Sequence, residues 1–184
     1  MNMQYIKTQS KAGNGLLIVV FTALFAALVT VTTMFIKIPT MFGYVHAGDS
    51  MIYLGASFLP GPFGVIASAI GGGMSDLISG YPHWVIPTAI IKALNALPFA
   101  IVRYYTSKRG KELRFISLPN MLMLIPTSLV TVFGYFVAHL LMYDWAAAIA
   151  GLATEWIQPT AGAIIFIALG LGLDGIGFKR KALK

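Results

Sequence analysis

The sequence predicts an all-α integral membrane protein, a compact bundle of six transmembrane helices, and three observations carry this prediction. First, 58% of the 184 residues are hydrophobic and only 10% are charged, with a mean hydropathy of +0.80, whereas soluble domains average about 25% charged residues. Second, uncharged apolar runs recur along the whole chain, and a helix needs about 20 such residues to cross a bilayer. Third, most of the basic residues gather in three short segments at the ends of those runs or beyond them. We expect residues 1–184 to form a single membrane domain.

The apolar runs define the helices in chain order. The second and third runs flank a Pro60-Gly61-Pro62 break. Two prolines around a glycine favour a turn over a kink within one long helix, so the chain has six spans rather than five. The expected spans are 16–36, 50–59, 63–78, 84–104, 118–143 and 146–173.

The basic segments support six spans. The N-terminal stretch carries Lys7 and Lys11, and residues 103–114 hold five basic residues and one acidic residue. The C-terminus adds Lys179, Arg180, Lys181 and Lys184. Six spans place all three segments on one side of the membrane, as the positive-inside rule requires, whereas five spans place the N-terminus opposite. We therefore expect a multi-pass protein of the cell membrane with both termini in the cytoplasm. The net charge of +7 is then a topology signal, and no nucleic-acid partner is expected.

With this orientation, the strongly polar residues fall in the outer loops and the outer halves of the spans. Spacing aligns several of them on shared helix faces: Thr88, Lys92 and Asn95 in the fourth span, Tyr135 and His139 in the fifth, and Glu155 and Gln158 in the sixth. Ionisable side chains within a span cost several kcal/mol unless they face a cavity or a partner, so they are functional candidates by default. The pattern predicts a polar cup that opens to the outside.

Some of these residues also have simpler explanations. Asp49 and Asp144 stand where they could cap the second and sixth spans, and Tyr143 and Trp145 stand where an interfacial aromatic belt would lie.

Lys92 lies about 12 Å into its span. It could snorkel outward, but we expect it to pair with Asp76 or Glu155.

Several functional classes are disfavoured. The chain has no cysteine, and its three histidines show no H-x-x-x-H or HExxH spacing, so we expect no metal site and no cofactor. The run GLGLDG matches G-x-G-x-x-G, but it closes a membrane helix, whereas the dinucleotide motif opens a helix after a strand. Gly71-Gly72-Gly73 is not a phosphate loop, because no Gly-Lys-Ser/Thr follows it. Ala67, Gly71 and Ser75 instead form a small-xxx-small face for close helix packing. No catalytic residue is expected.

Two stretches of the chain resemble the substrate-binding S components of energy-coupling factor (ECF) vitamin transporters. They are VHAGDSMIYLGASFLPGPFG and GGGMSDLISGYPHWVIPTAIIKALNA, and Ala23-x-x-x-Ala27 in the first span adds to the likeness. The resemblance implies a subunit without enzymatic activity that binds one vitamin with high affinity at the extracellular side. It also implies a membrane-embedded coupling subunit and two cytoplasmic ATPases as partners, which fits the absence of a Walker A motif here. It favours Ala23 and Ala27 as the contact with the coupling subunit, and the alternative is that this face packs inside the bundle.

Within the family, the chain is most similar to the riboflavin-type and hydroxymethylpyrimidine/pyridoxine-type groups. Side-chain donors, acceptors and ring faces suit a small heteroaromatic vitamin or precursor, pyridoxine-like or hydroxymethylpyrimidine-like. Riboflavin is the alternative, followed by cobalamin. A stand-alone secondary carrier or small channel is disfavoured because no inverted repeat is evident, and a scaffold without a ligand is disfavoured by the aligned polar faces. The expected ligand-binding residues are Asp49, Asp76, Tyr81, His83, Trp84, Lys92, Asn95, His139 and Glu155.

Overall fold

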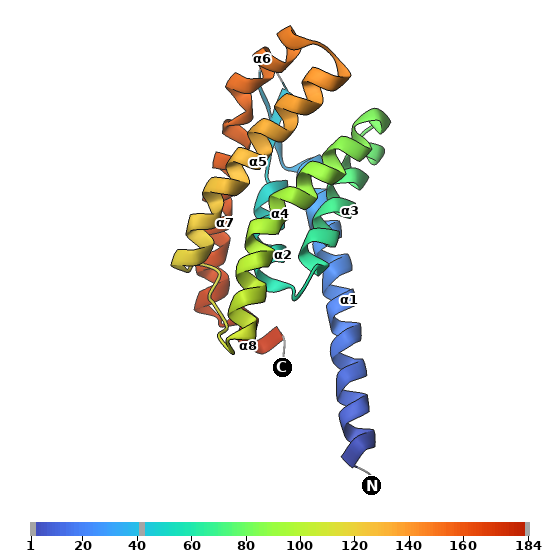
Figure 1. Cartoon of the computed structure of the whole chain (residues 1–184), viewed down its shortest axis with the longest axis vertical. Helices are drawn as coiled ribbons and strands as arrows, with labels where there is room; N and C mark the ends of the chain where they lie inside the picture. Colours follow the sequence, from blue (N-terminus) through green and yellow to red (C-terminus); the bar gives the residue numbers. More distant parts are fainter. Residues whose placement is uncertain (1–2, 41–42, 183–184) are drawn as a thin grey trace.

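The helices alternate in direction along the bundle (Figure 1). The structure is a computed structural model that describes residues 3–40 and 43–182. Helices α1, α3 and α5 run one way, and α2, α4 and α7 run the other way. The elements in chain order are α1 (Met3–Phe35), β1 (Lys37–Thr40), β2 (Gly43–His46), α2 (Gly48–Phe58), α3 (Phe63–Ile78), the 3₁₀ helix η1 (Pro82–Trp84), α4 (Val85–Lys108), α5 (Leu118–Met142), α6 (Trp145–Glu155), α7 (Ile157–Gly175) and α8 (Phe178–Ala182).

Helix α2 is the centre of the bundle. It packs against α1, α3, α4 and α7, and ten of its eleven residues are buried. Tyr53 stacks on Phe99 with 5.2 Å between ring centroids and meets Phe166 edge-on at 5.9 Å. A helix that is covered on all sides keeps its polar residues away from lipid, so these must find partners within the protein.

The Pro60-Gly61-Pro62 segment forms a turn, as the sequence predicts. Helix α2 ends at Phe58 and α3 begins at Phe63. Gly61 between them has φ +56°, in the left-handed region that glycine enters without steric cost. The turn therefore separates two antiparallel helices rather than kinking one.

The prediction of a helical membrane protein is confirmed, but six full-length spans are not. By length and composition, four segments of the described chain could cross a membrane: Gly15–Phe35, Pro82–Lys108, Leu118–Met142 and Trp145–Gly175. Helix α3 is apolar but has only 16 residues. Helix α2 has 11 residues and is about 16 Å long, against a hydrocarbon core of about 30 Å. Enclosure by its neighbours is what allows this short helix to lie within the bundle.

Two local features differ from the expected elements. Residues 37–46, which lie between the first two expected spans, contain an antiparallel hairpin that pairs Lys37 with His46 and Ile38 with Val45. The expected span 146–173 is broken, because α6 ends at Glu155 and α7 begins at Ile157. Pro159 lies in the first turn of α7, where a proline is tolerated, whereas in a continuous helix its ring would clash with the Glu155 carbonyl.

Two faces of small residues have opposite environments. Ala67, Gly71 and Ser75 of α3 are buried, and a Cβ at Gly71 would lie 2.6 Å from Val29 Cβ of α1. This face therefore packs α3 closely against α1, as its spacing predicts. Ala23 and Ala27 of α1 are instead exposed.

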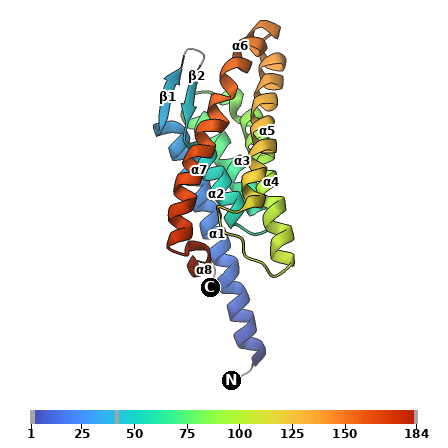
Figure 2. The same ribbon diagram turned by 90° about the vertical axis from the view of Figure 1, so that its left-hand side faces the viewer.

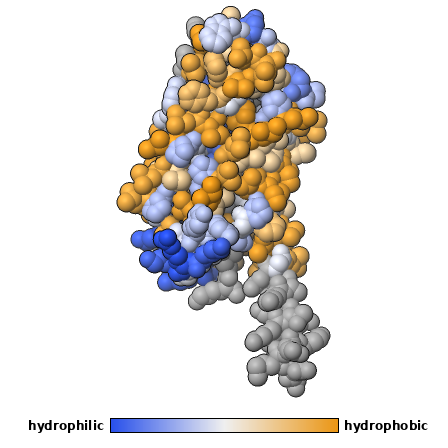
Figure 3. All heavy atoms as spheres, viewed as in Figure 1, coloured by the Kyte–Doolittle hydropathy of each residue, from blue (hydrophilic) through white to orange (hydrophobic). Residues whose placement is uncertain are grey.

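The two ends of the bundle differ in chemistry. The β1–β2 hairpin and α6 lie at one end, which we call the hairpin end, and α8 with the C-terminus lies at the other (Figure 2). Hydrophilic residues gather at the second end below a largely apolar surface (Figure 3), and we call it the basic end. The side chains of Lys7 and Lys11 and the whole of Lys184 lie outside the described part of the chain.

Candidate functional site

A group of polar side chains is buried where α2 starts, at the hairpin end. Its members come from four elements, and we call it the buried polar cluster: His46 at the end of β2, Asp49 in the first turn of α2, Lys92 in α4 and Gln158 in α7. Asp49 is 0% exposed and Lys92 is 1% exposed. Segments more than a hundred residues apart in sequence therefore meet at one carboxylate.

The Asp49 carboxylate is shared between two donors. Lys92 Nζ lies 2.5 Å from Asp49 Oδ1, and Gln158 Nε2 donates to Asp49 Oδ2 at 3.1 Å. The Gln158 amide also joins β2, because its Oε1 accepts from the His46 backbone N–H at 2.9 Å. One side-chain network thus ties α2, α4, α7 and the hairpin together.

His46 enters this network as a neutral ring. Its burial, followed by the nearby Lys92 charge, lowers the pKa of His46 to about 3. The Gly48 backbone N–H donates to His46 Nδ1 at 3.1 Å, so Nδ1 is the acceptor and Nε2 carries the proton.

Two glycines allow this close assembly. A Cβ at Gly72 of α3 would lie 2.7 Å from Lys92 Cγ, and a Cβ at Gly162 of α7 would lie 2.8 Å from Asp49 Cβ. Any larger residue would push one of these helices away. The ion pair is therefore enclosed by backbone on two sides.

Asp49 and Lys92 differ from the sequence expectation in their partners. Asp49 does not cap α2, because Ala47 is the N-cap and no side chain bonds there. Lys92 does not pair with Asp76 or Glu155 but with Asp49. The inward face of α4 meets the central helix α2, and Gly72 holds the Lys92 stem against α3. By contrast, Asp144 caps α6 as proposed, since its Oδ1 accepts from the Ala147 N–H at 2.8 Å.

The predicted polar face of α4 is buried as a whole. Thr88, Lys92 and Asn95 are each at most 4% exposed. Several fully enclosed polar atoms nearby have no partner in hydrogen-bond geometry within the described residues: both side-chain amide atoms of Asn95, the hydroxyl of Tyr53 and Oδ2 of Asp76. Buried polar atoms are rarely left unpaired, and here the Tyr53 side chain interacts with Asn95 and the Asp76 side chain interacts with Thr88.

Aromatic rings lie next to the buried polar cluster. We call this group the aromatic cluster: His83, Trp84, Tyr135, His139 and Tyr143. The Trp84 ring centroid is 5.1 Å from that of His139 and 6.0 Å from that of Tyr135. Trp84 Nε1 donates to the Tyr143 hydroxyl at 3.2 Å. Lys92 Nζ lies 5.4 Å from the Tyr135 ring centroid, so Tyr135 connects the two clusters.

The remaining expected site residues lie at the margin of these clusters. Tyr81 is 45% exposed, and its ring centroid is 6.4 Å from that of His83. Glu155 is half-buried at the end of α6. Glu155 and Gln158 were expected on one helix face, but the break at Trp156 separates them, and Gln158 alone joins the cluster.

Sequence reasoning left four residues of the two clusters out of the expected ligand site. Tyr135 and Gln158 had a signal, because each shares a helix face with an expected site residue. His46 had only its polarity in an apolar chain. Tyr143 was assigned to the aromatic belt, yet its hydroxyl also lies 3.4 Å from His83 Nε2, and no local pattern separates these roles.

A buried ion pair within a membrane bundle is costly to form and costly to break. Desolvation of two charges consumes much of their attraction, and removing one partner leaves an uncompensated charge. Ionisable residues in such positions commonly mark substrate or ion sites. The arrangement offers a cation, an anion, amide groups and ring faces within one region.

Comparison with known proteins identifies the family. Residues 15–174 match the family model described as ECF-type riboflavin transporter, S component. Comparison with curated protein sequences gave no significant match. The chain belongs to this family of S components, the vitamin-binding subunits of ECF transporters, and is a membrane transport protein rather than an enzyme.

Proposed function

We propose that this protein captures a small heteroaromatic vitamin at the hairpin end of the bundle, between the aromatic cluster and the buried polar cluster. The observation that carries the proposal is the enclosed Asp49–Lys92 pair beside the Tyr135 ring, which in turn lies against the Trp84 ring. Aromatic side chains stack on a flat ring, while a few converging polar groups fix its orientation and identity.

Riboflavin is the first ligand to test, because the matched family model carries that vitamin in its description. Pyridoxine and hydroxymethylpyrimidine are the second choice, since their rings and polar substituents suit the same groups. Cobalamin comes last. The proposed contacts include the nine residues expected from the sequence: Asp49, Asp76, Tyr81, His83, Trp84, Lys92, Asn95, His139 and Glu155. Tyr135 and Gln158 are added to this set.

Mass spectrometry of the purified protein tests the ligand directly. We expect a tightly bound vitamin to copurify. Alanine at Lys92, Asn95 or Glu155 should weaken binding by about tenfold or more, because losing one partner of a buried charged hydrogen bond costs about 2–5 kcal/mol. Asp144→Ala is the matched control, because Asp144 is an exposed cap at the same end. Unchanged affinity in all three variants would move the pocket away from these residues.

The proposed topology is a single membrane domain with six membrane-embedded helical segments and both termini in the cytoplasm. Its support is the alternation of helix direction (Figure 1) together with the basic residues Arg114, Lys179 and Arg180 at the basic end. Cysteines introduced as Lys111→Cys and Ser79→Cys should react with impermeant reagents from opposite sides. Labelling of both from outside contradicts this topology.

For transport, the protein would work with a membrane-embedded coupling subunit and two cytoplasmic ATPases, and we place the coupling contact at Ala23 and Ala27. Both are exposed on α1, and small residues allow another helix to approach closely. Ala23→Trp or Ala27→Trp should abolish ATP-driven uptake while vitamin affinity of the isolated protein stays near normal.

The neighbouring Ala26→Trp is the control for this contact, because Ala26 is buried against α3. That change should damage folding and binding together, since overfilling a packed core is destabilising. If the Ala23 and Ala27 variants behave like Ala26→Trp, the exposed face is not a docking surface.

A further inference from the structure

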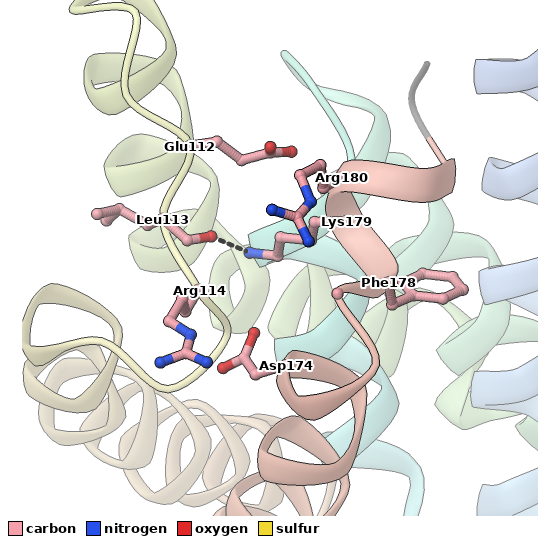
Figure 4. Close-up of a pocket in the computed structure, with 8 residues that line it drawn as sticks. Glu112, Leu113, Arg114, Asp174, Phe178, Lys179 and Arg180 are labelled. Atoms are coloured by element: carbon pink, nitrogen blue, oxygen red, sulfur yellow. Dashed lines mark hydrogen bonds between the residues drawn. The ribbon is translucent and has the colours of Figure 1, made fainter.

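The basic end contains a pocket of about 250 Å³ between the 109–117 connection and α8 (Figure 4). Its lining combines three basic residues with two acidic ones: Glu112, Leu113, Arg114, Asp174, Gly177, Phe178, Lys179 and Arg180. It lies at the opposite end from the two clusters described above and serves none of the roles given to them.

Within the described residues, the acidic side chains of this pocket form no ion pair with its arginines. Both carboxylate oxygens of Asp174 already accept backbone N–H groups, from Phe115 at 2.9 Å and from Ile116 at 2.8 Å. Within the described residues, no carboxylate oxygen lies within 4.0 Å of the Arg114 or Arg180 guanidinium. Both arginines are exposed, so their donors are open to an anion.

Lys179 adds a third basic side chain to the wall. It is only 6% exposed and donates to the backbone carbonyls of Ser57 at 2.8 Å and Leu113 at 3.0 Å. Its Nζ lies 4.1 Å from the Phe115 ring centroid. An ammonium has three donors, and these contacts use two of them and include no carboxylate. Burial, followed by the charge of Arg103, lowers the pKa of Lys179 to about 7.

The surroundings of the pocket match the boundary of a membrane. Leu118 follows the 109–117 connection and Ile176 follows α7, and they are 72% and 59% exposed. The apolar surface above the basic end leads directly to its hydrophilic residues (Figure 3). Basic pockets between membrane helices at this level bind anionic lipid head groups.

We propose that this pocket binds a phosphate-bearing anion through Arg114 and Arg180, and that the head group of an anionic phospholipid is its source. A guanidinium presents paired N–H donors that match two phosphate oxygens. The adjacent exposed apolar side chains would contact the acyl chains of the same lipid, which a soluble phosphate lacks.

Titration of phosphatidylglycerol into the delipidated full-length protein in neutral detergent tests this proposal, with thermal unfolding and native mass spectrometry as readouts. Phosphatidylglycerol should raise the unfolding temperature and remain bound, whereas phosphatidylcholine should do so much less. Arg114→Gln and Arg180→Gln should each weaken binding about fivefold, and the double variant roughly 25-fold. Lys111→Gln with Lys181→Gln is the matched control, because both lysines are exposed at the same end but do not line the pocket.

The outcomes separate the source of the anion from the existence of the site. The proposal is supported if phosphatidylglycerol stabilises the native protein and the lysine double variant but not the arginine double variant. An equal effect from glycerol phosphate, lost in the arginine pair, keeps the anion site but overturns the lipid as its source. Equal binding of both lipids, or equal losses in both variant pairs, overturns the site itself. Vitamin affinity is expected to be unchanged in every variant.

Discussion

Lys92 and Lys179 are both buried, but within the described residues only Lys92 has a carboxylate beside it. Lys92 faces Asp49 at the hairpin end. Lys179 at the basic end meets two carbonyl oxygens and a phenyl ring. The chain therefore contains one lysine that is held as half of an ion pair and one that acts as a hydrogen-bond donor between three segments.

The difference shows why burial alone does not identify a functional lysine. Carbonyl dipoles satisfy the donors of an ammonium but supply no countercharge, so burial lowers the pKa of Lys179 to about 7. Its contacts join α8 to the end of α2 and to the 109–117 connection. The carboxylate opposite Lys92 balances its charge, and any ligand that separates this pair must replace both interactions.

The largest expected effect follows from removing one half of the ion pair. Lys92→Met should lower the free energy of unfolding by about 3–5 kcal/mol, because it leaves the Asp49 charge buried with the Gln158 amide but without a countercharge. Lys92→Met combined with Asp49→Asn should recover most of this loss, while vitamin binding stays lost. Denaturant unfolding in detergent measures the free energy of unfolding, and a binding titration measures vitamin affinity. A double variant no more stable than Lys92→Met would show that the pair carries no such coupling.

A smaller effect is expected at the other lysine. Lys179→Met leaves the carbonyls of Ser57 and Leu113 without this donor and should cost about 1–3 kcal/mol, with vitamin affinity unchanged. Lys181→Met on the same short helix is the control, because Lys181 is exposed and surface substitutions change stability little. Equal losses in the two variants would mean that the Lys179 contacts do not stabilise α8.

The smallest expected effect is a dependence on pH. The pKa of Lys179 is about 7 in the folded protein and near 10.5 in an unstructured chain, so the unfolded state binds more protons between these values. Stability should therefore rise with pH, by about 1 kcal/mol from about pH 7 to about pH 8. Unfolding measured at both pH values in the native protein and in Lys179→Met isolates this contribution as the difference between the two slopes. Identical slopes would contradict the lowered pKa.

Local sequence patterns predicted several features because these depend on neighbouring residues alone. Composition and apolar runs indicated helices in a membrane, and the Pro60-Gly61-Pro62 segment indicated a turn. The spacing of Thr88, Lys92 and Asn95 indicated one face of a helix, and all three side chains are buried.

Spacing could not show which of two similar faces lies inside. The face of Ala67, Gly71 and Ser75 and the pair Ala23 and Ala27 both present small residues, yet the first packs against α1 and the second is exposed. The choice depends on how each helix is rotated within the bundle. That rotation follows from the packing of all neighbouring side chains together.

The sequence by itself determined that this is a helical membrane protein with an ionisable lysine inside a span, because hydropathy and charge are properties of the residues themselves. The sequence also identified the family, since residues 15–174 match the S-component family model. Only the tertiary structure decided that Asp49 rather than Asp76 or Glu155 is the partner of Lys92, and that Gln158 lies beside them. A bond between side chains this far apart in the chain depends on the depth and rotation of separate helices, and Gly72 and Gly162 set these by allowing close backbone contact.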